Sequence, residues 1–271
     1  MKTLKESILG STKTGTSAFI VPNSRNELKQ LIEKEIKEKG NNCDLNHIKT
    51  FKITDMWGLF ASSKFNGDIS KWDVHNVTDM CNMFENSNFN GDISNWNVSS
   101  VIDMSNMFYN SDFNGDISKW NVRKVAYMNY MFDRSKFNGD ISKWDVSEVE
   151  NMEGMFCRSD FNNDISKWNV SNVRDMNSMF WQSKFNKDIS KWDVRKVKNM
   201  NSMFSCSKFN KDISKWNVSN VEKMREMFYD SEFNRDISNW NINPNCKTEY
   251  MFGLSKIKEE YKPKQNGKII K

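Results

Sequence analysis

The chain has 271 residues, of which 37% are hydrophobic and 28% charged, and its formal net charge is +5. Six lysines and two glutamates after Ser255 supply +4 of that charge, so the rest of the chain is close to neutral. Binding to a phosphate backbone needs a concentrated basic face, and this balance argues against nucleic acid as the main partner.

The chain begins with a polar segment and continues into a helix. We expect residues 1–22 to be a flexible leader and residues 23–64 to form an N-terminal cap. Ser24 and Glu27 have capping-box spacing, and Gly40 stands where a helix ends. The apolar stripe of this helix consists of Leu28, Leu31, Ile32 and Ile36.

The apolar stripe of this helix has two interpretations. It could bind a partner, but the position favours a cap, because a stack of repeats needs an atypical terminal unit with a polar outer face. The segment 51–60 supports the cap, since its apolar residues follow the second half of the repeat described next. We therefore expect a helix and a degenerate half repeat at this end.

A 24-residue unit then dominates the sequence. It starts at Phe65 and returns without insertion, so that seven full copies end at Glu232. An eighth copy starts at Phe233 and loses the pattern near Pro244. A fixed period of this length is the signature of a solenoid or a related array. We assign 65–255 to the eight-copy repeat, with the last copy as a cap, and 256–271 to a basic, mobile tail.

One copy predicts its own local structure. Ile69, Trp72, Val74 and Val77 follow the frame I-x-x-W-x-V-x-x-V, which is similar to the frame of leucine-rich repeats. Trp72 and Val74 are two residues apart, as on one side of a short strand. The spacing from Val77 to Phe84 fits one face of a helical turn. The predicted fold is an α/β solenoid, a leucine-rich-repeat-like stack of short parallel strands and short helical or 3-10 segments with an N-terminal helical cap.

Polar positions repeat as strictly as apolar ones. Asn66, Asp68 and Ser70 recur in all eight copies. Stacked aspartates should repel, and Asx-turns, in which the carboxylate accepts an N–H two residues on, are the expected compensation. Calcium is the alternative, because G-D occurs in calcium-binding β-helix loops. The glycine of that pair is replaced in later copies, by Asn163, Lys187, Lys211 and Arg235. We therefore predict no metal and no cofactor.

The cysteines and the N-terminal segment indicate the cellular compartment of the protein. The five cysteines form no ladder and no C-x-x-C pair, which fits a reducing environment. The N-terminus lacks the apolar run of a secretory signal, and no stretch approaches the roughly 18 apolar residues of a membrane span. The sequence therefore predicts a cytoplasmic protein without a lipid anchor or a membrane partner.

The unit D-I-S-K-W-D-V-S-N-V-x-D-M-x-x-M-F resembles the repeats of BspA-like leucine-rich-repeat proteins, which are common in bacteria and their mobile elements. Asp164 to Val173 reads D-I-S-K-W-N-V-S-N-V, and Met176 with Met179-Phe180 completes the unit. The resemblance covers residues 51–255. It implies a leucine-rich-repeat-like fold and a role in adhesion or protein binding. Many members carry a signal or a lipid anchor, which is absent from this sequence, so the surface location is not expected here.

Specificity should come from positions that vary between copies. In the predicted geometry three exposed columns lie on the strand-bearing face, and an acidic protein partner is expected to bind there; a solvated face without a partner is the alternative. The candidate binding residues are Lys71, Asp73, His75, Lys119, Arg123, Lys143, Asp145, Lys167, Lys191, Asp193, Arg195 and Lys215. A second variable column holds Tyr109, Cys157, Trp181 and Tyr229.

Catalytic patterns are absent from the sequence. His47 and His75 stand outside any catalytic spacing, and no nucleotide loop, G-x-S-x-G or H-E-x-x-H occurs. The predicted function is a non-enzymatic protein–protein interaction module. The alternatives are a surface adhesin of the BspA-like type, a phage or mobile-element protein that inhibits a host factor, and self-association.

Overall fold

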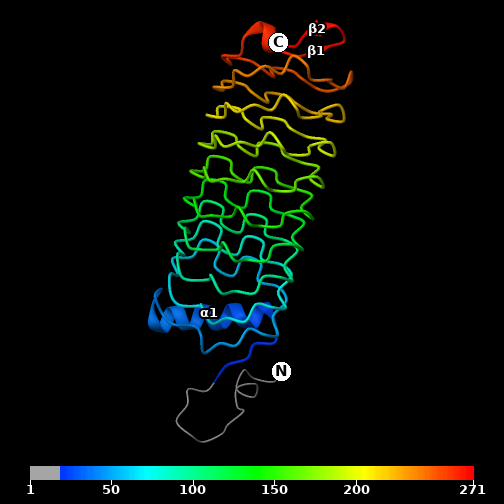
Figure 1. The fold of residues 1–271 in the computed structure, drawn as a ribbon. Helices are drawn as coiled ribbons and strands as arrows, with labels where there is room; N and C mark the ends of the chain where they lie inside the picture. The colour runs from blue at the N-terminus through cyan, green and yellow to red at the C-terminus, as the bar shows by residue number, and fades with distance from the viewer. Residues whose placement is uncertain (1–18) are drawn as a thin grey trace, which may run out of the picture.

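In the computed structural model, which describes residues 19–271, the repeat copies form one continuous stack (Figure 1). Most of the leader expected for 1–22 lies outside the described residues. The described part of it is tied to the stack: Ile20 pairs in parallel with Ile48, and the ammonium of Lys49 lies 4.2 Å from the centre of the Phe19 ring.

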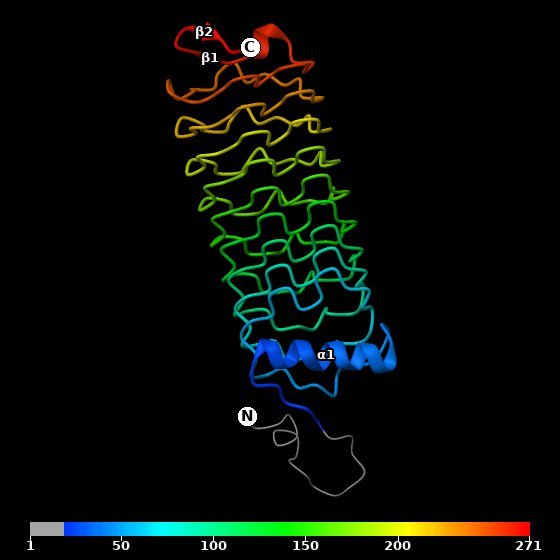
Figure 2. The ribbon, with the colours of Figure 1, turned by 180° about the vertical axis from the view of Figure 1, so that it is seen from behind.

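The predicted N-terminal helix is confirmed. Helix α1 (Arg25–Lys39) begins where the Ser24 side chain accepts the N–H of Glu27 and ends where Gly40 donates to Ile36 at a φ of 85°. Leu28 and Ile32 are buried in the same core as the repeats. The helix lies across the N-terminal end of the stack (Figure 2), where it covers apolar side chains that would otherwise face water.

The repeat begins earlier than predicted. We expected only a half repeat before residue 65, but residues 41–64 form a whole copy, in which Asp44 pairs in parallel with Asp68. Its apolar residues fill the columns of the following copy: Leu45, Ile48 and Thr50 are buried, and they stand 24 residues before Ile69, Trp72 and Val74. The replacement of tryptophan by isoleucine hides this copy in the sequence.

The copies are joined by a backbone ladder in a different place from the predicted strand. Isolated parallel bridges run through Asp55, Asp79, Asp103 and their equivalents up to Lys247. Residues 72–74 form no strand. Trp72 there donates its backbone N–H to Ile69 in a turn and its indole N–H to the carbonyl of Leu45 in the preceding copy. Side chains, rather than a backbone ladder, therefore tie this side together.

The predicted helical segment is a series of turns. The N–H of Met83 donates to Met80, and the N–H of Ser87 donates to Phe84, each across three residues. Asn82 and Asn86, the third residues of these turns, have φ of 57° and 52°. Left-handed residues are characteristic of type II turns and stop a right-handed helix from continuing. The backbone N–H groups that these turns do not use, such as those of Met80 and Asn82, therefore donate to carbonyls of the next copy.

Aromatic side chains form the core in stacked columns. Phe84 and Phe89 lie 4.3 Å apart between ring centroids, and Phe84 lies 5.7 Å from Phe108 in the next copy. The tryptophan column is also buried, and each indole N–H is accepted by a carbonyl of the preceding copy, as with Trp144 and Ile117 at 3.1 Å. Identical residues thus contact one another along the whole stack, as a repeat requires.

The expected Asx-turns are present in every copy. The carboxylate of Asp140 accepts the backbone N–H of Ser142 at 2.9 Å, and Asp164 accepts that of Ser166 at the same distance. These bonds hold the pKa values of both aspartates below the usual range. Local donors thus offset the repulsion between stacked carboxylates.

These aspartates make stability sensitive to acid. A carboxylate whose pKa is lower in the folded state stabilises the fold above its unfolded pKa of about 3.9 and loses that contribution as pH falls through the folded pKa. The melting temperature should therefore decrease when the pH is lowered below about 4. The double variant Asp140→Asn and Asp164→Asn keeps an acceptor in each turn, so its melting temperature should fall less steeply. An equal slope in circular dichroism melts of both proteins would contradict this assignment.

The C-terminal segment is a folded cap, which corrects the expectation of a mobile tail for 256–271. It contains η1 (Glu259–Tyr261) and the antiparallel hairpin of β1 (Lys264–Gln265) and β2 (Lys268–Ile269). Ile257 is buried at the position of the repeat phenylalanine, and Ile270 is buried with it. The side-chain amide of Gln265 donates to the carbonyls of Asn243 and Cys246. These contacts cover part of the C-terminal end of the last copy.

Candidate interaction surface

The candidate binding residues lie in three adjacent columns on one side of the stack, which we call the polar face. It comprises the twelve residues Lys71, Asp73, His75, Lys119, Arg123, Lys143, Asp145, Lys167, Lys191, Asp193, Arg195 and Lys215. All are exposed except Asp193, which is half-buried. The backbone ladder runs through other columns, so the polar face is not the strand-bearing face that the sequence suggested.

The acidic groups of the polar face have polar partners within it. Asp73 lies 2.6 Å from Nδ1 of His75. Asp193 accepts two bonds from the Arg195 guanidinium, at 2.7 and 2.8 Å, and these bonds lower the pKa of its carboxyl. Asp145 accepts from Ser147, which lowers its pKa, and lies 3.9 Å from Arg123 in the preceding copy. Each of the three aspartates therefore has a hydrogen-bond or ion-pair partner on the face.

The lysines of the polar face remain unpaired. Six of them occupy one column: Lys71, Lys119, Lys143, Lys167, Lys191 and Lys215. In the described part of the chain no carboxylate lies within ion-pair distance of these ammonium groups. The column forms a row of ammonium groups beside the Asx-turn aspartates, whose carboxyl pKa values are lowered by the turn hydrogen bonds and by these lysines. The row still offers several positive groups to an outside partner.

An open hollow of about 570 Å³ lies at the edge of the polar face. Asp193 and Arg195 line it together with Ser171, Lys196 and Asn220. The amide of Asn220 donates to the carbonyl of Arg195, and Lys196 donates to the side chain of Asn172. These bonds join neighbouring copies and hold the walls of the hollow in place.

The second variable column is less exposed than expected. Cys157 is buried, and Tyr109, Trp181 and Tyr229 are half-buried. The guanidinium of Arg158 lies 5.1 Å from the centre of the Trp181 ring, so this aromatic side chain already has a partner within the chain. This column therefore contributes more to contacts between copies than to an open binding surface.

Exposed apolar residues occur at positions that the sequence reasoning missed. Ile102 and Tyr127, in consecutive copies, are 46% and 43% exposed, and the N–H of Tyr127 donates to the carbonyl of Ile102. Tyr250 and Leu254 are more exposed still, in the last copy. Each lies where most copies carry polar residues. Comparison of the columns could have found them.

Three of the cysteines lack the low pKa of a reactive thiol. Burial raises the pKa of Cys81 and of Cys157 to about 12, and that of Cys246 to about 11, so these thiols stay protonated at neutral pH and are poor nucleophiles. Within residues 19–271 no group of three histidine, cysteine or acidic side chains is arranged to hold a metal ion.

The stacked copies and their repeating buried columns define the chain as a repeat protein. Its sequence matches the family described as "Mycoplasma protein of unknown function, DUF285" over residues 27–136, 98–184 and 157–262. These overlapping matches span most of the chain, and the chain belongs to this family. No curated protein and no solved structure matches it. The single α-helix of the described region falls short of the length and apolar character that crossing a membrane requires.

Proposed function

We propose that this protein is a non-enzymatic interaction module that binds an acidic protein partner on the polar face. The main supporting observation is the row of six lysines without an ion-pair partner, beside aspartates that have polar partners within the face. Such a row attracts negative charge along several copies at once, which raises the association rate and sets the orientation of the partner.

The same proposal includes the finer description of the fold. We infer a solenoid related to leucine-rich repeats of the BspA-like type, supported by the 24-residue unit and by the parallel bridges between copies. Solenoids of this kind offer an extended surface to partners. Five free cysteines support a reducing compartment such as the cytoplasm.

Charge reversal on the polar face tests this function. Four changes, Lys119→Glu, Arg123→Glu, Lys191→Glu and Arg195→Glu, should abolish capture of the partner from native lysate, because they replace attraction by repulsion. A control with the same change of net charge reverses four exposed residues outside the face: Lys64, Arg134, Lys223 and Lys256. It should retain capture.

The outcomes of that experiment separate the alternatives. Equal capture by both variants would remove the polar face from the proposal. Loss of capture by both would indicate a response to net charge alone. If the unmodified protein captures nothing and light scattering shows oligomers, self-assembly replaces partner binding. Turnover in a broad substrate screen would argue for an enzyme.

A further inference from the structure

The backbone ladder ends at the C-terminal copy with its donors unused. In each copy from residue 41 to residue 232, four alternate N–H groups donate to carbonyls of the following copy, for example from Met224 to Lys247 and from Glu226 to Glu249. The last copy is followed by η1 and the hairpin rather than by another ladder segment. Among the described residues, the equivalent N–H groups, which belong to Thr248, Tyr250, Phe252 and Leu254, donate no hydrogen bond.

This end presents donors, and the other end presents acceptors. The N–H and the carbonyl of each ladder peptide point in opposite directions along the stack, so carbonyls such as that of Trp57 face the N-terminal end. There Arg25 donates its Nε to Trp57 at 2.6 Å, and α1 lies across the end (Figure 1). The helix and Arg25 cover part of this end, which disfavours head-to-tail stacking of two molecules.

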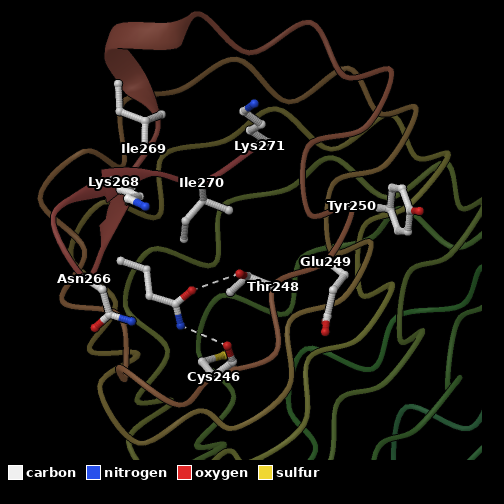
Figure 3. A pocket seen from close by; sticks show the side chains of 10 residues that line it. Cys246, Thr248, Glu249, Tyr250, Asn266, Lys268, Ile269, Ile270 and Lys271 are labelled. Carbon is white, nitrogen blue, oxygen red and sulfur yellow. Dashed lines mark hydrogen bonds between the residues drawn. The ribbon is translucent and has the colours of Figure 1, made fainter.

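The donor edge is open to a partner. Tyr250 and Leu254, which lie on it, are 71% and 73% exposed, the highest values among the large apolar side chains of the described region. A hollow of about 630 Å³ adjoins the edge between Cys246 and Tyr250 on one side and the C-terminal hairpin on the other. Figure 3 shows Lys268 and Ile269 across this hollow from Glu249 and Tyr250.

The charges around the hollow favour an acidic occupant. Both oxygens of Glu249 accept bonds from the Arg225 guanidinium, at 2.7 and 3.2 Å. Lys268 and Lys271 line the hollow and have no ion-pair partner among residues 19–271. Unpaired backbone N–H groups add positive partial charge in the same place. Donors, lysines and exposed apolar side chains therefore converge on one strip of surface.

We propose that this strip, residues 248–254 with the adjoining hairpin, binds an extended acidic segment of a partner protein, which adds one rung to the ladder. Alternate carbonyls of the segment accept the four N–H groups, in the manner of strand addition at a sheet edge. Its acidic side chains face Lys268 and Lys271, and its apolar side chains cover Tyr250 and Leu254. This site is separate from the polar face and does not depend on it.

Amide hydrogen exchange on the whole protein tests the site. The probe is a synthetic acetyl-(Glu-Val)₄-amide peptide, with the (Lys-Val)₄ analogue as a control. In the free protein the amides of Thr248, Tyr250 and Leu254 should exchange rapidly, and the acidic probe should slow them while the basic analogue does not. The variant Lys268→Glu with Lys271→Glu should weaken binding by at least about tenfold. The charge-matched variant Lys34→Glu with Lys64→Glu, at exposed positions outside both this site and the polar face, should bind normally.

Three results would overturn the proposal. The first is slow exchange of these amides in the free, monomeric protein, which would mean that the edge is already satisfied. The second is slow exchange that depends on protein concentration, which would identify a second copy as the occupant. The third is binding of the acidic probe without protection of residues 248–254, or equal weakening in both lysine variants, which would reduce the interaction to general charge.

Discussion

Replacing Arg158 by methionine should lower the free energy of unfolding by about 3–5 kcal/mol, because it leaves a buried carboxylate without its partner. Asp133 is only 1% exposed and accepts two bonds from the Arg158 guanidinium, at 3.2 and 2.9 Å. The guanidinium also lies over Trp181. The Arg158 side chain thus joins residues of three consecutive copies. Urea unfolding followed by circular dichroism measures the loss.

Two further variants isolate the cause. Arg134→Met changes an arginine in the same column with a similar left-handed φ, 57° against 52° at Arg158. The Arg134 side chain is exposed and forms no ion pair within the described chain. It should cost less than about 0.5 kcal/mol. Adding Asp133→Ala to Arg158→Met removes the buried charge and should recover part of the stability. If Arg134→Met and Arg158→Met cost the same, the ion pair is not responsible.

The variant Trp144→Ala should cost about 3–5 kcal/mol, the usual loss when a large aromatic side chain is removed from a core. Trp144 is buried in the middle of the stack, and its indole N–H is bonded to Ile117. The ring also contacts Phe132, at 6.4 Å between centroids. Because each copy contacts only its neighbours, we also expect a broader unfolding transition in the variant, as the two halves of the stack uncouple.

The control for this change is Trp57→Ala at the N-terminal end. Trp57 is 46% exposed, and its ring centre lies 4.8 Å from the Arg25 guanidinium. An exposed contact of this kind contributes about 0.5–1 kcal/mol. Denaturant titrations of the two variants should therefore differ several-fold in their effect. A loss below about 1 kcal/mol for Trp144→Ala would show that the tryptophan column is not a main source of stability.

The sequence is informative about this fold wherever identical residues recur. The period, the buried columns and the Asx-turns follow from positions such as Trp72 and Asp68, because repetition repeats the same physical constraint in each copy. The cap helix follows from Ser24 and Gly40. The strand was misplaced because Trp72 and Val74 have the spacing of a strand, while their segment uses its backbone in a local turn.

Contacts between unlike residues of neighbouring copies were harder to predict. Asp133 and Arg158 stand 25 residues apart, so they meet only if the copies are aligned and the adjoining columns are compared. Copy 41–64 was missed because Leu45 and Ile48 keep the apolar character of the repeat but not its residue types. The folded C-terminal segment was missed because its lysines suggest solvent, whereas Ile257 and Ile270 anchor it in the core.

The uniform direction of the ladder gives the molecule an electrical polarity. Its peptide groups point the same way in every copy, so their dipoles add along the stack, with the positive pole at the C-terminal end. An α-helix has its positive pole at the N-terminus, so the polarity here is reversed relative to chain direction. Arg25 lies at the negative pole and partly compensates it. The lysines of the hairpin reinforce the positive pole, and an anionic partner should therefore approach the stack end-on.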